Sequence, residues 1–223
     1  MSHATSIVFV VDDDISVRES LEPWIRHQGW QPEIFDSAQE FLGRSRPLAP
    51  SCLIFNLSHS GLDGVDVQKR IARERAGIPI IVMSPCGDTP TTVQAMKAGA
   101  VEFLVKPFNN DALLGAICES LDRSREALQR EMELRELRNR FASLSPREQQ
   151  VMALVATGML NKQVGGELGI SEITVKAHRG RVMQKMLAQS FVDLVKMAWR
   201  LRLDRGFLPS SQFRSPSPAA MAA

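Results

Sequence analysis

The stretch Ile7–Asp14, IVFVVDDD, decides how the first half of this chain folds. Its first five residues are apolar and four of them are β-branched, which is typical of a strand buried on both faces of a parallel sheet. The run stops at three aspartates, as such a strand does at its polar carboxyl edge. Residues 16–28 follow with apolar side chains at helical spacing, so the segment predicts a strand–helix unit.

The same unit recurs along the first 120 or so residues. Predicted strands at 31–35, 52–57, 78–84 and 101–105 are followed by predicted helices at 38–42, 65–73, 91–97 and 110–121. This alternation predicts an α/β, doubly wound, five-stranded parallel sheet with right-handed crossovers. Ligands of such sheets bind beyond the carboxyl ends of the strands. The polar residues that end four of the strands should therefore converge: Asp12 and Asp13, Asn56, Ser84, and Lys106.

Several longer motifs in this half resemble the receiver domain of two-component response regulators, which has a flavodoxin-like fold. They are VVDDD at 10–14, SGLDG at 60–64 and the stretch from GD at 87–88 through VQAMKAGAVEFLVKPF at 93–108. The resemblance implies that Asp12, Asp13 and a central aspartate bind Mg²⁺ and that this aspartate attacks a phosphoryl donor. Ser84 and Lys106 would then stabilise the phosphoryl group. Phe103 matches a switch aromatic, which either reports the state of the site to the fourth helix and fifth strand or is part of the core.

One residue departs from the family at the central position, where Asn56 stands in place of the phosphoacceptor aspartate. A carboxamide oxygen has almost no nucleophilicity, and it lacks the negative charge that a hard cation prefers. We therefore expect no phosphorylation at Asn56, no required cofactor and no more than a weak Mg²⁺ site at Asp12 and Asp13. Lys106 should pair with one of these aspartates. A phosphoryl-transfer enzyme would need a nucleophile that is missing, so we predict a protein that is not an enzyme.

The asparagine has two explanations, natural divergence or an engineered Asp-to-Asn change. The neighbouring Ser58-His59-Ser60 and Pro85-Cys86 also depart from the usual receiver sequence. A single engineered substitution would leave those positions intact, so the sequence favours natural divergence.

Charge divides the chain into three parts. Residues 1–118 carry 10 basic and 14 acidic side chains, residues 119–142 carry 6 of each, and residues 143–223 carry 11 basic and 5 acidic ones. A basic second half suits a polyanionic partner such as nucleic acid. We predict a receiver domain at 1–119, a helical linker at 120–142, a DNA-binding domain at 143–204 and a disordered tail at 205–223, which is rich in Ser, Pro and Ala.

The predicted linker is part of a long, charged helix that runs from about Asp111 to Phe141. Glu precedes Arg by four residues in three pairs, 126/130, 131/135 and 136/140, and each such pair stabilises an exposed helix by about 0.3 kcal/mol. An intermittent apolar stripe also runs along it, either as the seam of a dimer or as a face that lies on the adjacent domains. Its members are Leu121, Leu128, Met132, Leu137, Phe141 and Leu144.

The second half has the pattern of a four-helix, all-α domain. Ser145-Pro146 reads as an N-cap and first helical residue, and this helix runs to about Thr157. A short helix over Asn161–Leu168, a turn containing Gly169, and a helix from the N-cap Ser171 to about Leu187 form a helix-turn-helix. A fourth helix, 191–203, closes the bundle. Gly165, Gly166 and Gly180 weaken the helices that contain them, and only Gly165 matches a position where the fold needs a small residue.

The string LSPREQQVMALVATGMLNKQVGGELGISEITVKAHRGRVMQKM, residues 144–186, resembles the DNA-binding domain of the LuxR/NarL/FixJ family. The resemblance implies that the third helix of this domain faces bases or nearby phosphates and that the helix before it holds phosphates. The residues implied are Asn161, Lys162, Ser171, Thr174, Lys176, Ala177, Arg179 and Arg181.

Composition excludes several other classes. With 44% hydrophobic and 23% charged residues the chain is neither fibrous nor wholly disordered. Its apolar runs are far shorter than the about 20 residues that span a bilayer, and its three cysteines have no metal-binding or disulfide spacing. We expect a cytoplasmic protein with no membrane partner.

Two functions remain. The first is a transcriptional regulator of two-component type that binds promoter DNA at paired half-sites as a homodimer, with a sensor histidine kinase or RNA polymerase as a further partner. The second is an interaction protein whose receiver binds a sensor or another regulator and modulates its output.

Overall fold

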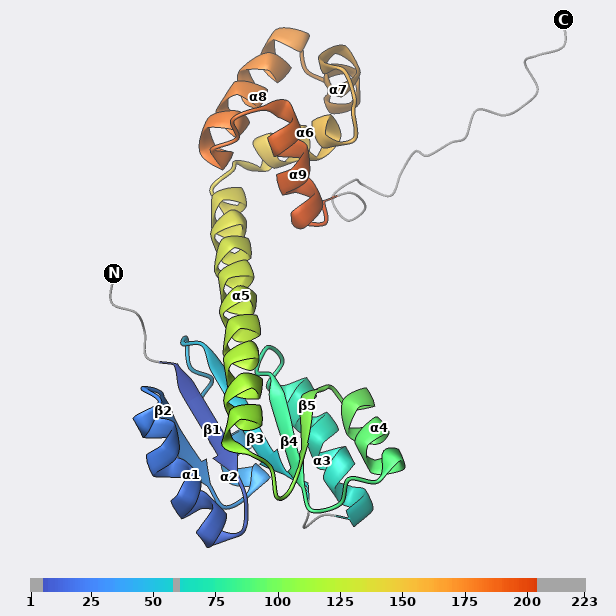
Figure 1. Ribbon diagram of the computed structural model, residues 1–223. Helices are drawn as coiled ribbons and strands as arrows, with labels where there is room; N and C mark the ends of the chain where they lie inside the picture. The colour runs from blue at the N-terminus through green and yellow to red at the C-terminus, as the bar shows by residue number, and fades with distance from the viewer. Residues whose placement is uncertain (1–5, 58–60, 204–223) are drawn as a thin grey trace, which may run out of the picture. The chain divides into compact units, whose positions relative to one another are not determined.

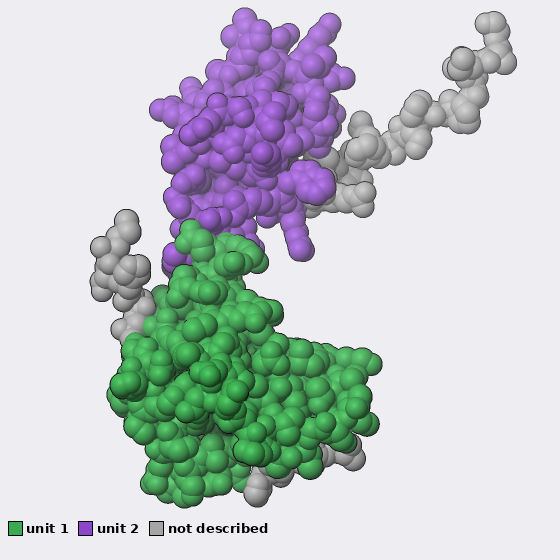
Figure 2. Space-filling model, in the orientation of Figure 1, with its two compact units in different colours: residues 1–131 green, residues 132–223 purple. Residues whose placement is uncertain are grey.

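The computed structural model describes residues 6–57 and 61–203. The chain divides into two compact units, residues 1–131 and 132–223, which Figure 2 colours green and purple. Each unit has its own hydrophobic core.

The first unit is built on the predicted five-stranded sheet (Figure 1). All neighbouring strands are parallel, in the order β2-β1-β3-β4-β5. The strands are β1 (Ile7–Val11), β2 (Gln31–Phe35), β3 (Ser51–Asn56), β4 (Ile80–Ser84) and β5 (Ala100–Val105). Because β1 lies between β2 and β3, the chain reverses its direction of winding at β1, and this is where open α/β sheets form their binding crevice.

Helices cover both faces of this sheet. One face packs against α1 (Ile15–His27) and the first turns of α5 (Asn110–Ala142). The other packs against α2 (Ala38–Gly43), α3 (Gly61–Glu74) and α4 (Thr89–Lys97). Alternate residues of β1 supply the two cores, since Val8 faces α1 and α5 whereas Phe9 faces α2. Burial on both faces explains why this strand is an unbroken apolar run.

The predicted long helix is confirmed as α5, but one of its three predicted ion pairs differs. Ion pairs join Glu126 to Arg130 at 2.7 Å and Glu136 to Arg140. Glu131, however, accepts a hydrogen bond at 2.9 Å from Arg46, between α2 and β3, so the predicted pair between Glu131 and Arg135 is wrong. A basic side chain brought close by the fold competes with the neighbour one helical turn away.

The apolar stripe on α5 packs mainly on the cores of the two units. Leu121 is buried in the core of the first unit, and Leu137 and Leu144 are buried in that of the second, where Phe141 also packs. Met132, in contrast, is 60% exposed. Most of the stripe therefore lies on the cores of the chain's own two units.

In its described residues, up to position 203, the second unit contains the end of α5 and four further helices. They are α6 (Pro146–Ala156), α7 (Asn161–Leu168), α8 (Glu172–Met186) and α9 (Phe191–Arg200). The predicted all-α helix-turn-helix unit is confirmed, although α9 ends at Arg200 and not near Leu203. Val175, Val182 and Met186 of α8 are fully buried in its core.

The turn between α7 and α8 depends on two glycines. Gly169 has a φ of 66° and ends α7 in the left-handed conformation. A Cβ on Gly165 would lie 2.7 Å from the carbonyl oxygen of Ile170, so only glycine permits this close approach of helix and turn. Nothing lies within 4 Å of a Cβ built on Gly166 or Gly180, so neither position requires glycine for steric reasons.

Some predictions fall outside the described residues: the 205–223 tail and the Ser58-His59-Ser60 segment. Within residues 6–57 and 61–203, no helix is both long enough and apolar enough to cross a bilayer.

Candidate functional site

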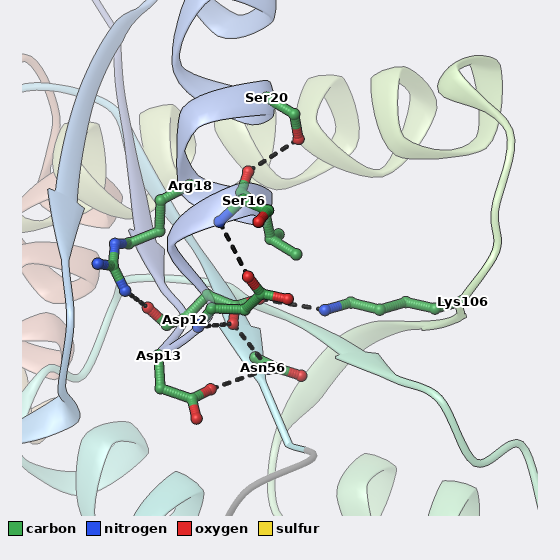
Figure 3. A network of polar contacts seen from close by, with 9 residues as sticks. Asp12, Asp13, Ser16, Arg18, Ser20, Asn56 and Lys106 are labelled. Atoms are coloured by element: carbon green, nitrogen blue, oxygen red, sulfur yellow. Dashed lines mark hydrogen bonds and ion pairs between the residues drawn. The ribbon is translucent and has the colours of Figure 1, made fainter.

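The strand ends bring four of the predicted residues into one polar cluster, formed by Asp12, Asp13, Asn56 and Lys106 (Figure 3). Asp12 and Asp13 follow β1, Asn56 ends β3, and Lys106 follows β5. Asp12 is 1% exposed and Asn56 9% exposed, whereas Asp13 lies at the surface. The parallel sheet creates the cluster, because it places the carboxyl ends of these strands at the same edge.

Asp12 has a partner for each of its oxygen atoms. Its Oδ1 accepts hydrogen bonds from Asn56 Nδ2 at 2.8 Å and from the Asp14 amide at 2.9 Å. Its Oδ2 pairs with Lys106 Nζ at 3.1 Å, and its main-chain carbonyl accepts from Arg18 Nη1 at 2.6 Å. A buried carboxylate is costly unless it is paired and hydrogen-bonded, and this one is both.

Asn56 bridges the two carboxylates with one amide nitrogen. Nδ2 donates to Asp12 at 2.8 Å and to Asp13 Oδ1 at 3.4 Å (Figure 3). Carboxylates are acceptors only, so the nitrogen and not the oxygen of the amide must face them. A neutral donor therefore stands where a third carboxylate would be repelled by the other two.

This arrangement is a poor site for a magnesium ion. Mg²⁺ requires near-octahedral oxygen ligands, and Asn56 presents N–H groups to the two aspartates. In the described part of the chain, this cluster included, no three His, Cys, Asp or Glu side chains come together in a way that could hold a metal ion.

Ser84 and Phe103, the other two predicted receiver residues, have partners outside the polar cluster. Ser84 is 3% exposed at the end of β4, and its Oγ accepts a hydrogen bond from the Cys86 amide at 3.2 Å. Its main-chain carbonyl accepts from the Lys106 amide at 2.8 Å, which fixes the start of the loop after β5. Phe103 is half-buried and packs against the core beneath α2, α3 and α4.

A second candidate site is the exposed face of α8. Six exposed residues three or four positions apart form one stripe, which we call the α8 face. They are Ile173, Lys176, Ala177, Gly180, Arg181 and Gln184. A second helix of a helix-turn-helix with a basic outer face suits the major groove of DNA. Lys176, Ala177 and Arg181 were expected at the DNA; Ile173 was not, although it precedes Ala177 by one helical turn.

The start of α8 is fixed by its own side chains. Ser171 Oγ accepts from the Thr174 amide at 3.1 Å and lies 2.9 Å from Thr174 Oγ1. Lys176 pairs with Glu172 at 3.2 Å along the same helix. In the protein without DNA, capping thus occupies Ser171 and Thr174, and an acidic neighbour partly neutralises Lys176.

Arg179 links three helices. It donates from Nη1 to Asn161 Oδ1 of α7 at 3.2 Å, and its guanidinium lies 4.6 Å from the ring centroid of Phe191 in α9. The structure thus brings together Asn161 and Arg179, which were both predicted to contact DNA, and it places Arg179 between helices. Lys162, also predicted to contact DNA, is exposed. Phe191 was not predicted, because contacts between helices leave no local spacing signal.

Glu148 joins the N-terminus of α6 to α8. It forms a capping box with Ser145, and its Oε2 accepts a hydrogen bond from Lys185 Nζ at 2.7 Å. The hydrogen bond from Lys185, together with that from the Ser145 amide, holds the pKa of the Glu148 carboxyl below its ordinary value. The basic end of α8 is thereby tied to the rest of its unit.

Comparison with known proteins agrees with both halves of the structure. Residues 8–118 match the response regulator receiver domain, and residues 142–198 match the luxR family of bacterial regulatory proteins. The chain belongs to the two-component response regulators that carry a luxR-type DNA-binding domain.

Among its relatives is Nodulation protein W of Bradyrhizobium diazoefficiens, which is 46% identical over 93% of this chain and 91% of that protein. The response regulator protein TmoT of Ectopseudomonas mendocina is 42% identical over 91% of this chain and 92% of its own length. Among solved structures, the response regulator StyR is 45% identical and superposes with a TM-score of 0.75, covering 88% of this chain and all of StyR.

Proposed function

We propose that this response regulator binds DNA without being phosphorylated at Asn56. The observation that carries the proposal is the pair of hydrogen bonds from Asn56 Nδ2 to Asp12 and Asp13. They give the two carboxylates a neutral partner where a receiver would use an aspartate and a cation. On this proposal the chain is not an enzyme and requires no cofactor, and Asp12 and Asp13 form no more than a weak site for Mg²⁺.

The chemistry of the polar cluster supports this proposal. Phosphoryl transfer to a receiver needs an anionic oxygen as nucleophile, and the amide of Asn56 cannot supply one. Lys106 is already paired with Asp12 at 3.1 Å, so it stabilises a buried carboxylate. The polar cluster therefore has a structural role, and the receiver is held in one chemical state.

The α8 face supports DNA as the partner. Lys176 and Arg181 are exposed on one side of the helix, and Lys162 is exposed on α7. Arg179 and Asn161 would contact the backbone of the DNA while also fixing α7 against α8. A symmetric site with paired half-sites would bind a homodimer, and a sensor kinase or RNA polymerase would be a further protein partner.

The proposal divides the chain into a receiver domain at 1–119, a linker at 120–142 and a DNA-binding domain at 143–204. The family matches at 8–118 and 142–198 support these bounds. We place the protein in the cytoplasm, where promoter DNA is reached.

Intact-mass spectrometry with a small phosphodonor and Mg²⁺ tests the first part. The wild-type chain should gain no phosphoryl group and should keep its sedimentation coefficient, whereas Asn56→Asp should gain one group. A gain in the wild-type chain would show that another residue accepts phosphate and would overturn the proposal.

DNA binding is tested by selecting sites from a random duplex pool with the full-length chain. The double variant Lys176→Ala and Arg181→Ala should bind the selected site more weakly and with a shallower dependence on salt, because fewer counterions are released. Unchanged affinity and salt dependence would remove α8 from the DNA interface.

A further inference from the structure

Ile173 is the most exposed large apolar side chain of α8. It lies in the first turn of the helix and is 79% exposed, while Val175, two residues later, is fully buried. Ile173 takes no part in the cap of the helix, which Ser171 forms, and α8 packs into the core of the second unit through Val175, Val182 and Met186. Neither the fold nor the cap of α8 thus explains a branched apolar residue here.

The position of Ile173 places it beside the cationic residues of α8. It precedes Lys176 by three residues and Ala177 by four, so all three lie on the α8 face. In a helix-turn-helix, the N-terminal residues of the second helix reach the edges of the bases. Ile173 and Ala177 therefore form a small apolar surface at the end of the helix that enters the groove, next to a positive charge suited to phosphate.

The chemistry of the major groove limits what such a surface can recognise. Three of the bases present only hydrogen-bond donors and acceptors there, and thymine alone adds an apolar group, its C5-methyl. An isoleucine placed over a donor or acceptor would leave that group unpaired, which is unfavourable. A methyl group, in contrast, gains contact with the isoleucine and loses water.

We infer that Ile173 reads the C5-methyl group of thymine, so that each half-site carries a thymine where α8 begins. This inference rests on the proposed function, because it requires DNA to bind along the α8 face. It names the base that this face prefers, and it assigns Ile173 a specificity role that the family resemblance did not predict.

The test compares thymine with uracil, which lacks only the methyl group. After site selection with the full-length chain, each thymine of the selected duplex is replaced in turn by deoxyuridine, and the dissociation constant is measured. Removal of the contacted methyl should weaken binding about fourfold, a change equivalent to about 0.8 kcal/mol. The other thymines should show no such change.

Variants connect this effect to one residue. Ile173→Ala should bind the thymine and uracil duplexes equally at that position and keep the wild-type salt dependence, since no charge is lost. Val192→Ala, which shortens another exposed branched residue, 62% exposed on α9, should retain the wild-type preference for thymine. Ile173→Gln serves as a second variant, and circular dichroism confirms that each variant is folded.

The outcomes separate the inference from the proposed function. Failure to select any specific DNA would refute the proposed function itself. Specific binding with no position sensitive to uracil would leave that function standing and overturn the inference. A preference for thymine that survives in both Ile173→Ala and Ile173→Gln would also overturn it, because another residue would then read the methyl.

Discussion

Replacing Asn56 by aspartate should make the stability of the first unit depend on magnesium. The change removes a donor 2.8 Å from Asp12 and 3.4 Å from Asp13 and puts a carboxylate oxygen in its place. Two unit charges 4 Å apart in an environment with an effective dielectric constant of about 20 interact by about 4 kcal/mol. The lost hydrogen bond to a charged group contributes about 1.5–3 kcal/mol more.

Two effects offset part of this loss. Lys106 stays 3.1 Å from Asp12, and the crowded carboxylates can take up a proton because their mutual repulsion raises the pKa. We therefore expect Asn56→Asp to lower the free energy of unfolding by about 2–4 kcal/mol in chelator at neutral pH, within the range measured for broken buried networks. Mg²⁺ at about 100 times its dissociation constant should restore about 2.7 kcal/mol.

The pH dependence has a defined sign. A carboxyl group whose pKa is raised by folding stabilises the folded state at low pH, and that contribution is lost as the pH rises through the raised pKa. In chelator, the difference between Asn56→Asp and the wild-type chain should therefore shrink as the pH falls. In the wild-type chain, position 56 has no charge to titrate.

Tryptophan fluorescence during urea unfolding measures this effect. In a Trp199→Phe background, where the replaced side chain is 74% exposed, the remaining signals come from Trp24 and Trp30, which pack on the core of the first unit. Asn139→Asp, at an exposed position on α5, adds the same charge and should change little. If Asn56→Asp is as stable as the wild-type chain in chelator and indifferent to Mg²⁺, our account of the polar cluster is wrong.

Three other changes test the second unit. Glu148→Gln should lower its stability by about 1 kcal/mol, because the hydrogen bond from Lys185 loses its negatively charged acceptor, whereas glutamine can still complete the capping box with Ser145. Lys185 lowers the pKa of Glu148, so the contribution of this carboxylate to folding stability is present above the ordinary glutamate pKa and is lost as the pH falls below it. Urea unfolding at several pH values measures this loss. Equal acid sensitivity of the wild type and the variant would contradict this role. Leu160→Ser should raise the melting temperature measured by calorimetry. Leu160 is the N-cap of α7, is 69% exposed and has no side-chain acceptor, whereas a serine cap contributes about 0.5–2 kcal/mol. An unchanged melting temperature would argue against α7 beginning there. Glu172→Gln should tighten DNA binding, because it frees Lys176 from a 3.2 Å ion pair and removes a charge that repels phosphate. A DNA titration that shows equal or weaker binding would mean that the Glu172–Lys176 pair does not limit DNA affinity.

The sequence predicted the features that follow from local patterns and from the shared carboxyl edge of parallel strands. Buried strands such as β1 are continuous apolar runs, and their ends locate Asp12 and Asn56 without any knowledge of the structure. The sequence also predicted that Lys106 pairs with an aspartate, because the ends of the strands bring this lysine close to Asp12 and Asp13 while position 56 carries no carboxylate. The structure identifies Asp12 as that partner, since Asp12 is the buried member of the pair.

What the sequence missed depends on contacts between distant segments. Arg46 takes Glu131 from its helical neighbour although 85 residues separate them, and no periodicity predicts such a pair. Arg179 is similar, because its cation–π contact with Phe191 exists only once α9 has packed against α8. The exposure of Ile173 was visible only after the core of the second unit had been seen to close without it.

The hydrogen bonds of Asn56 also affect how the gene can change. Codons for asparagine and aspartate differ by one base, so a single point mutation can place a carboxylate at this position. The amide, however, is bound to Asp12 and Asp13, and the Asn56→Asp protein must carry three crowded carboxylates until a cation binds. A change that needs only one base therefore lowers the stability of the folded protein, and selection on stability would act to retain the asparagine.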